Sequence, residues 1–308
     1  MQKTKGFIGA LAILLMTMVF AACAGRTDEP NDEPTAPVTF YDGEGHLITL
    51  HERPSTIVSI GPSNTEIIMA LGFGDGIVAA DDNFVEGLDP AVKTLSMWGI
   101  DMEHIISLNP DIIIASSMIL FAGDPLTSAR DLGIAVVYIP SSDSIEKVKD
   151  DIRLIARIFG EDAVGEALVA DMAAEIADIE RVVQTIETRR TVYFEISASP
   201  FTAGGDTFLN ELIEIAGGIN IFADQQGWPS PSAETILERN PEVILTSTNY
   251  LESDPVDEIL GRAGWGAVAA VQNGDVFFID TDTSSRSNHN VVHAIREIAQ
   301  AIYPEYFE

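Results

Sequence analysis

The chain has 308 residues, 46% of them apolar, and 48 acidic against 17 basic side chains give it a formal net charge of −31. This balance argues against nucleic acid as a partner, because phosphate groups would be repelled. With Cys23 as the single cysteine, an internal disulfide framework is excluded, so the fold must depend on its apolar core. The length suffices for one large domain or two lobes.

Residues 1–22 have the composition of a secretory signal. Lys3 and Lys5 precede an apolar run over residues 7–20. The run is shorter than the roughly 20 residues that a helix needs to cross a bilayer. Small residues lead to Cys23, which resembles the bacterial lipobox whose cysteine becomes lipid-modified, although Phe20 replaces the usual aliphatic residue. We expect export and a lipid anchor at Cys23, on the outer face of the cell membrane or in the periplasm; cleavage elsewhere, leaving a free thiol, is the alternative.

Residues 23–37 follow as a predicted flexible tether. Residues 24–37 include three prolines and almost no large apolar side chains. Such a composition cannot bury enough surface to order itself. Removing residues 1–22 deletes Lys3 and Lys5 and no acidic residue, so the charge of −31 becomes −33 in the mature chain.

The body alternates short apolar runs with longer helical stretches. The runs that read as buried strands are 56–60, 77–80, 111–115, 135–139, 191–196, 243–246 and 276–279. Residues 64–71 form a predicted helix that ends at Gly72, and residues 290–302 form the last one. Strands that alternate with helices predict parallel sheets covered on both faces.

A stretch without strand signal divides the body. Helices are predicted over 144–159 and 162–188, separated at Gly160. In the second helix, Ala167, Met172, Ile176, Ile179 and Val183 recur at spacings of three to five residues. The predicted fold is therefore α/β, with an N-terminal α/β lobe over 38–160, a linking helix over 161–189 and a C-terminal α/β lobe over 190–308.

An internal repeat supports the two lobes. Residues 103–116 (EHIISLNPDIIIAS) recur as residues 234–247 (ETILERNPEVILTS), with glutamate, Asn-Pro-acid, apolar triplet and serine in one register. Each copy predicts a short helix that stops before proline and leads into a buried strand. Two copies in equivalent places indicate duplicated lobes, and a ligand cleft between them at the carboxyl ends of the strands.

The body resembles the solute-binding proteins of ABC importers for iron–siderophores, haem and vitamin B12. The resemblance covers nearly all of it, and the most specific stretches are 53–66 (RPSTIVSIGPSNTE), 107–114 (SLNPDIII), 207–220 (TFLNELIEIAGGIN) and 265–277 (WGAVAAVQNGDVF). It implies two Rossmann-like lobes joined by a rigid helix, the class III periplasmic binding protein arrangement. It also implies a monomer that binds a metal chelate without catalysis or a resident cofactor and delivers it to a permease with ATPase subunits.

The resemblance also implies roles for single residues. Glu103 and Glu234 match the glutamates that dock onto permease arginines; the alternative is that each only stabilises a helix N-terminus. The residues that resemble ligand contacts are Trp98, Phe201, Trp228 and Arg286. Aromatic rings suit flat ligands, and the Arg286 guanidinium suits anionic siderophores. Loop packing is the alternative for the aromatic residues, and Trp265 is interpreted as structural, ahead of a strand-turn-strand pattern.

Other chemistry finds little support. His289 and His293 are four apart but lack a third ligand, so no metal site is expected. Haem would need an axial ligand, for which Tyr138, Met97 and Met118 are candidates but better core residues. Residues 72–76 (GFGDG) follow a helix and precede a strand, the reverse of a dinucleotide loop. A haem importer component and an anchored sensor or surface enzyme stay as alternatives to a siderophore or corrinoid binder.

Overall fold

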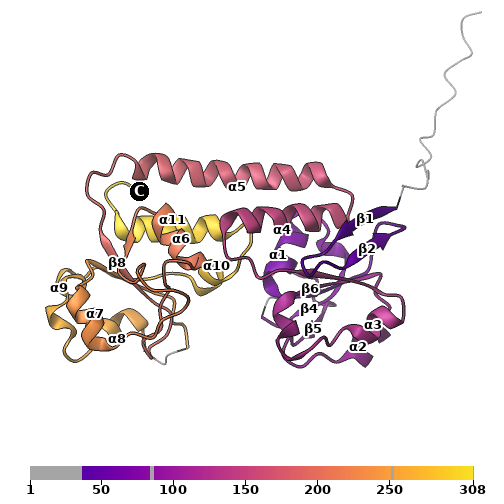
Figure 1. The fold of residues 1–308 in the computed structure, drawn as a ribbon, viewed down its shortest axis with the longest axis horizontal. Coiled ribbons are helices and arrows are strands. Elements are labelled where there is room, and N and C mark those ends of the chain that lie inside the picture. The colour runs from indigo at the N-terminus through magenta and orange to yellow at the C-terminus, as the bar shows by residue number, and fades with distance from the viewer. Residues whose placement is uncertain (1–36, 84–86, 251–252, 308) are drawn as a thin grey trace, which may run out of the picture. The chain divides into compact units, whose positions relative to one another are not determined.

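The computed structural model describes residues 37–83, 87–250 and 253–307. The predicted signal 1–22, Cys23 and all but the last residue of the predicted tether lie outside them. Within the body, two parallel sheets are each covered by helices, and the long helix α5 (Asp162–Val183) runs between the two lobes (Figure 1). No helix among the described residues has the length and apolar character needed to cross a membrane.

The N-terminal lobe is built on a five-stranded parallel sheet in the order β5-β4-β3-β6-β7. Its strands are β3 (Ile57–Ile60), β4 (Ile77–Asp81), β5 (Lys93–Leu95), β6 (Ile112–Ser116) and β7 (Ala135–Ile139). Its helices are α1 (Pro62–Ala70), α2 (Met102–Ser107), α3 (Thr127–Asp131) and α4 (Ile145–Ile158), with the 3₁₀ turns η1 (Gly74–Gly76) and η2 (Ser117–Ala122). The hairpin of β1 (Val38–Tyr41) and β2 (Leu47–Leu50) precedes them. The central strand β3 is buried along its whole length, which explains its continuous apolar sequence.

The C-terminal lobe repeats this plan with four strands in the order β11-β10-β8-β9. The strands are β8 (Thr191–Glu195), β9 (Ile219–Asn220), β10 (Val243–Thr246) and β11 (Val276–Phe278). The helices are α6 (Phe208–Ile215), α7 (Ala233–Arg239), α8 (Pro255–Leu260), α9 (Ala269–Asn273), α10 (Thr281–Ser285) and α11 (Val291–Ile302). Read in chain order, β8, β9, β10 and β11 occupy the places of β3, β4, β6 and β7, as expected for duplicated lobes.

The internal repeat has the same backbone in both lobes. Asn109, directly after the C-cap Leu108 of α2, and Asn240, the C-cap of α7, have φ of 49° and 44°. They are the non-glycine residues with positive φ in the described part of the chain. Asparagine tolerates this left-handed conformation better than most residues. The acid after each proline then anchors a neighbouring strand, since Asp111 accepts hydrogen bonds from the Ser55 and Thr56 amides and Glu242 from the Thr191 amide.

Helix α5 packs against α4, α6 and α11, so that one apolar cluster continues from one sheet to the other. Its buried stripe repeats at three and four residues and comprises Gly165, Val169, Met172, Ile176, Ile179 and Val183. Gly165 allows close contact, because a Cβ there would lie 2.5 Å from the Ala156 Cβ of α4. Two details of the prediction are wrong: Ala167 is exposed, and the helix ends at Val183 rather than 188.

Trp265 is buried in the core of the C-terminal lobe, as its structural interpretation expected, with the Arg262 guanidinium 4.4 Å from its ring centroid. The strand-turn-strand pattern expected after it is wrong. The chain instead forms the 3₁₀ turn η3 (Trp265–Ala267) and the short helix α9 before β11. The alanine-rich sequence of residues 267–270 favours a helix over a strand.

Candidate functional site

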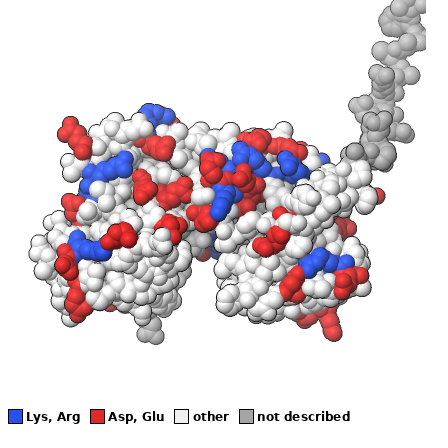
Figure 2. All heavy atoms as spheres, in the orientation of Figure 1, with Lys and Arg blue, Asp and Glu red and all other residues white. Residues whose placement is uncertain are grey.

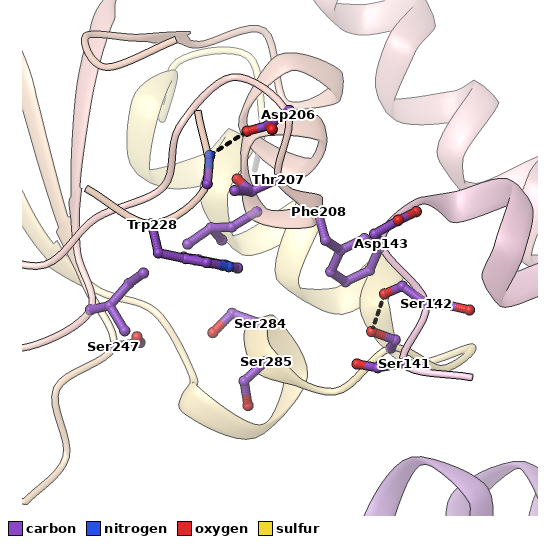
Figure 3. Close-up of a pocket in the computed structure, with 14 residues that line it drawn as sticks. Ser141, Ser142, Asp143, Asp206, Thr207, Phe208, Trp228, Ser247, Ser284 and Ser285 are labelled. Carbon is purple, nitrogen blue, oxygen red and sulfur yellow. Dashed lines mark hydrogen bonds between the residues drawn. The ribbon is translucent and has the colours of Figure 1, made fainter. Parts of the chain in front are cut away.

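A cavity of about 350 Å³ lies where segments of both lobes meet beyond the carboxyl ends of the strands. Its lining is formed by Ser141, Ser142, Asp143, Ile196, Asp206, Thr207, Phe208, Leu209, Gly227, Trp228, Ser247, Ser284, Ser285 and Ser287. Figure 3 shows the labelled members around the open space, with the Trp228 ring pointing into it. The volume falls within the range of small-molecule sites, and the position is where open α/β sheets bind ligands.

Six serines give the lining its polar character. Residues 141 and 142 follow β7, Ser247 follows β10, and the other three lie in or directly after α10. Their side chains offer uncharged hydroxyl donors and acceptors. The Ser287 hydroxyl donates to the Ser142 carbonyl oxygen at 2.8 Å, which joins the two lobes at the cavity. Ser141 and Ser247 follow apolar runs in the sequence, but serines are too common for this position to select them.

Phe201 and Trp228 form an aromatic pair beside the cavity. Their ring centroids lie 6.1 Å apart with an interplanar angle of 22°. Phe201 is placed by a tight loop in which its carbonyl oxygen accepts from the Ile196 amide at 3.0 Å. Trp228 is 49% exposed although it lines the cavity. The structure therefore brings together two of the four residues that the sequence analysis interpreted as ligand contacts.

Trp98 lies elsewhere. It occupies a turn after β5 in the N-terminal lobe, is 68% exposed and is absent from the described cavity lining. Its exposure leaves the ring available to a ligand larger than the cavity, and ligand contact at Trp98 stays a prediction.

Arg286 is held in a contact between the lobes. Its neighbours Ser285 and Ser287 line the cavity, whereas its guanidinium donates to Glu66 on α1 at 2.6 Å and to the Asn83 carbonyl oxygen at 2.9 Å. It also pairs with Asp282 at 2.9 Å. The contact with a ligand predicted for Arg286 is untested, and any such contact has to compete with these carboxylates.

Glu66 is the centre of this contact, and the sequence analysis missed it. Its side chain is buried, and it accepts hydrogen bonds from the amides of Asn288 and Asn290 at 2.7 Å each, in addition to Arg286. We call the group of Glu66, Arg286, Asn288 and Asn290 the interlobe clasp. Three donor nitrogens in fixed positions satisfy a buried carboxylate whose isolation would be costly.

His289 lies next to the clasp. Its Nδ1 is buried without a hydrogen-bond partner among the described residues. Burial lowers the pKa of His289, Glu66 opposes the shift, and His293 adds to it. In the described part of the chain no three His, Cys, Asp or Glu side chains are arranged to hold a metal ion.

A buried carboxylate, Asp151, and a half-buried one, Glu211, lie behind the cavity wall. Asp151 on α4 accepts a hydrogen bond from the Ser142 hydroxyl, and burial raises the pKa of Asp151 to about 7. Glu211 on α6 accepts from the Ile145 amide of the other lobe at 3.0 Å. Burial also raises the pKa of Glu211, and the carboxylates of Glu146, Glu214 and Asp143 add to that shift.

Glu103 and Glu234 occupy equivalent exposed positions. Each is the second residue of its helix, Glu103 in α2 and Glu234 in α7. The N-caps of these helices are Asp101 and Ser232, whose side chains accept hydrogen bonds from the backbone amides of His104 and Thr235. Because each helix leads into the amino end of β6 or β10, its own first turn lies toward the carboxyl edge of the sheet. The same placement also permits a helix-stabilising role, so docking stays a prediction.

Comparison with known proteins agrees with the fold. The pattern of the family described as "Periplasmic binding protein" matches residues 57–283. The chain is 32% identical, over the full length of both chains, to an uncharacterized ABC transporter substrate-binding lipoprotein, YvrC, of Bacillus subtilis. It is 26% identical to a cobalamin-binding protein of Halobacterium salinarum, over 97% of this chain and 85% of that one.

A solved structure of a possible iron-binding, periplasmic solute-binding protein from Staphylococcus epidermidis is also similar. It has a TM-score of 0.74 and 30% identity, and the match covers 82% of this chain and all of the other. The chain therefore belongs to the periplasmic binding protein family, whose members are substrate-binding proteins of ABC transporters rather than enzymes.

Proposed function

We propose that this chain captures a metal chelate, a ferric siderophore or a corrinoid, in the cavity between its lobes and delivers it to an ABC permease with its ATPase subunits. The observation that carries the proposal is the cavity itself, which combines an aromatic wall at Trp228 with a ring of serine hydroxyls. Such a lining suits a ligand with a flat apolar face and a polar fringe. Similar proteins named for cobalamin and for iron point to the same class.

Haem is less well supported. Haem iron in proteins is usually held by His, Tyr, Met or Cys. None of these is among the described lining residues. Of the earlier candidates, Tyr138 is buried and donates to Asp124 at 2.6 Å, and Met97 packs against the core of the N-terminal lobe. The interpretation of Met118 as a core residue is wrong, since its side chain is 48% exposed, but it lies outside the described cavity lining.

Ligand binding is tested by isothermal titration of the purified protein with cyanocobalamin, a ferric trihydroxamate, a ferric tricatecholate and haemin. Saturable binding of one class supports the proposal, and nanomolar affinity would correspond to about −12 kcal/mol. Tryptophan fluorescence then locates the ligand. Quenching that is lost in Trp228→Phe but kept in Trp98→Phe places the ligand against the cavity wall, since the third tryptophan, Trp265, is buried. No binding of any chelate would contradict the proposal.

We also propose that the protein is extracytoplasmic and anchored through a lipid on Cys23, which lies outside the described residues. Metabolic labelling with palmitate should mark the protein in cells and be lost in Cys23→Ser. Labelling that persists in this variant would contradict the anchor.

Docking is proposed to involve Glu103 and Glu234. Charge pairs of this kind fix orientation and encounter rate more than affinity. Reversal of both, Glu103→Lys with Glu234→Lys, should abolish uptake while ligand affinity stays unchanged. Glu238→Lys, which reverses an exposed charge on the same helix as Glu234, is the matched control and should transport normally. Loss of ligand binding in the docking variant would refute the assignment.

A further inference from the structure

We infer that the cavity selects its ligand by charge: it accepts neutral or cationic chelates and discriminates against anionic ones. This inference rests on the proposed function, because it concerns which chelates the cavity binds. The expected ligands are then corrinoids, which carry amide groups at their edge, and neutral or cationic hydroxamate siderophores. Catecholate and carboxylate siderophores, which are anionic, should bind more weakly.

The first support is the charge of the lining. Among the described residues around the cavity there is no Lys, Arg or His, whereas Asp143 and Asp206 are both present. Asp206 is held at the cavity by a hydrogen bond that its Oδ1 accepts from the Gly227 amide at 2.6 Å. Figure 3 shows Asp143 beside the Phe208 ring and Asp206 near Thr207, and both aspartates are exposed. An anionic ligand would enter a site whose fixed charges are all negative.

The second support is that the cations beside the lining already have carboxylate partners. Lys147 lies 2.7 Å from Asp143 itself. Arg286, whose neighbours in sequence line the cavity, is paired with Glu66 and Asp282. The stretches 84–86 and 251–252, which the structure does not describe, contain no Lys or Arg in the sequence. These six charged side chains together leave an excess of two negative charges.

The third support is the charge behind the wall. Helix α6 begins at the cavity, because its N-cap Thr207 and its first residue Phe208 belong to the lining, and a helix N-terminus by itself favours an anion. However, Glu211 occupies that turn, and its raised pKa reflects burial together with the carboxylates of Glu146, Glu214 and Asp143. The carboxylates of Glu146, Glu214 and Asp143 therefore already disfavour a further negative charge near this helix terminus.

The remaining contacts of the lining suit an uncharged ligand. Serine hydroxyls can donate to carbonyl oxygens and accept from amide groups, which are the groups on the fringe of a corrinoid. The aromatic pair of Phe201 and Trp228 adds an apolar face, and electron-rich rings of this kind also attract a cationic group.

The test uses ligands of one shape and different charge. Ferrioxamine B carries one positive charge, its N-acetyl derivative is neutral, and its N-succinyl derivative carries one negative charge. Cyanocobalamin and its monocarboxylic acid give a second pair, neutral and anionic. Affinities are measured by isothermal titration at low ionic strength, where the anionic member of the series that binds should be about tenfold weaker than the neutral one. Added salt should reduce this ratio, because both aspartates are exposed.

The double variant Asp143→Asn with Asp206→Asn keeps the side-chain size and one acceptor oxygen in each side chain, and it should reduce the ratio to about threefold or less. Asp171→Asn on the exposed face of α5 removes a carboxylate far from the cavity and should leave the ratio unchanged. An anionic ligand that binds as tightly as its neutral partner, or a ratio that the double variant does not change, would overturn the inference alone. If no chelate of either series binds, the proposed function fails and the inference with it.

Discussion

Asp151 shows how a single side chain can couple the cavity to pH. It is buried on α4 and accepts a hydrogen bond from Ser142, which lines the cavity. Desolvation raises the pKa of Asp151 from 3.8 to about 7, while the Ser142 hydrogen bond opposes the shift. Since the folded state holds this proton more tightly than the unfolded state, stability from this group is complete below about pH 4 and is lost as the pH rises to about 7.

Replacement of Asp151 by asparagine should remove this pH dependence. The amide cannot ionise but can still accept from Ser142, so Asp151→Asn should match the wild type near pH 4 and exceed it in stability by about 2–4 kcal/mol at pH 8. Thermal unfolding followed by circular dichroism over this pH range measures the difference. Asp171→Asn is the control, and a difference between Asp151→Asn and wild type that does not grow with pH would show that Asp151 is not the titrating group.

At the scale of single residues, the sequence analysis identified some residues of the candidate site and missed others. Phe201 and Trp228 were identified through the resemblance to metal-chelate binding proteins, and the structure places their rings together. Glu66 did not stand out, because the partner that explains it, Arg286, lies 220 residues away in the sequence. Neither hydrophobic periodicity nor local turn chemistry carries information over that separation.

At the scale of elements, the interlobe clasp ties α1 to the segment between α10 and α11. The side chains of Glu66 and Arg286 are 8% and 13% exposed, so their attraction is weakly screened. A further contact between the lobes, the hydrogen bond from the Ile145 amide to Glu211, lies at the start of α4. Together with the core that continues through α5, these contacts favour small changes in lobe position over wide opening.

Removal of the charge from the clasp should be costly. Glu66→Gln leaves Arg286 without its buried carboxylate partner and cannot accept all three hydrogen bonds, so we expect a loss of about 3 kcal/mol in the free energy of unfolding. Denaturant titration with an unchanged m-value measures it. Glu175→Gln makes the same change at a half-exposed pair, 3.9 Å from Arg296, and should cost less than about 0.5 kcal/mol. Equal losses in the two variants would argue against the clasp.

The sequence predicted long, buried elements better than short ones. The strands β3 and β10 lie where their apolar runs indicated, because every residue of a central parallel strand must avoid water. The edge strands β5 and β9 have three and two residues, too few to show a period, and were not expected. Their position follows from pairing with β4 and β8, which is tertiary information.

At the scale of the whole molecule, acidic charge is in large excess. Figure 2 shows Asp and Glu side chains over much of the visible face, with most Lys and Arg next to them. A formal charge of −31 leaves many carboxylates without a basic neighbour, and their mutual repulsion opposes the compact state.

Screening of this repulsion should stabilise the protein. Raising sodium chloride from low to physiological concentration should raise the melting temperature by about 2–4 °C for each kcal/mol of repulsion removed. Differential scanning calorimetry measures the shift, and sucrose at equal osmolality separates screening from solute exclusion. A melting temperature that falls with salt would mean that the ion pairs contribute more than the repulsion.

The two lobes share one strand order, and Glu103 and Glu234 begin equivalent helices. A partner that has a two-fold axis therefore meets nearly the same acidic contacts after the binding protein turns by half a revolution. In the docking that we propose, the binding protein can therefore bind the permease in two orientations instead of one. This doubles the fraction of collisions that lead to docking without adding a contact. The strand β5 has no counterpart among the described strands of the C-terminal lobe. A difference of this kind between the lobes would allow a partner to distinguish the two orientations.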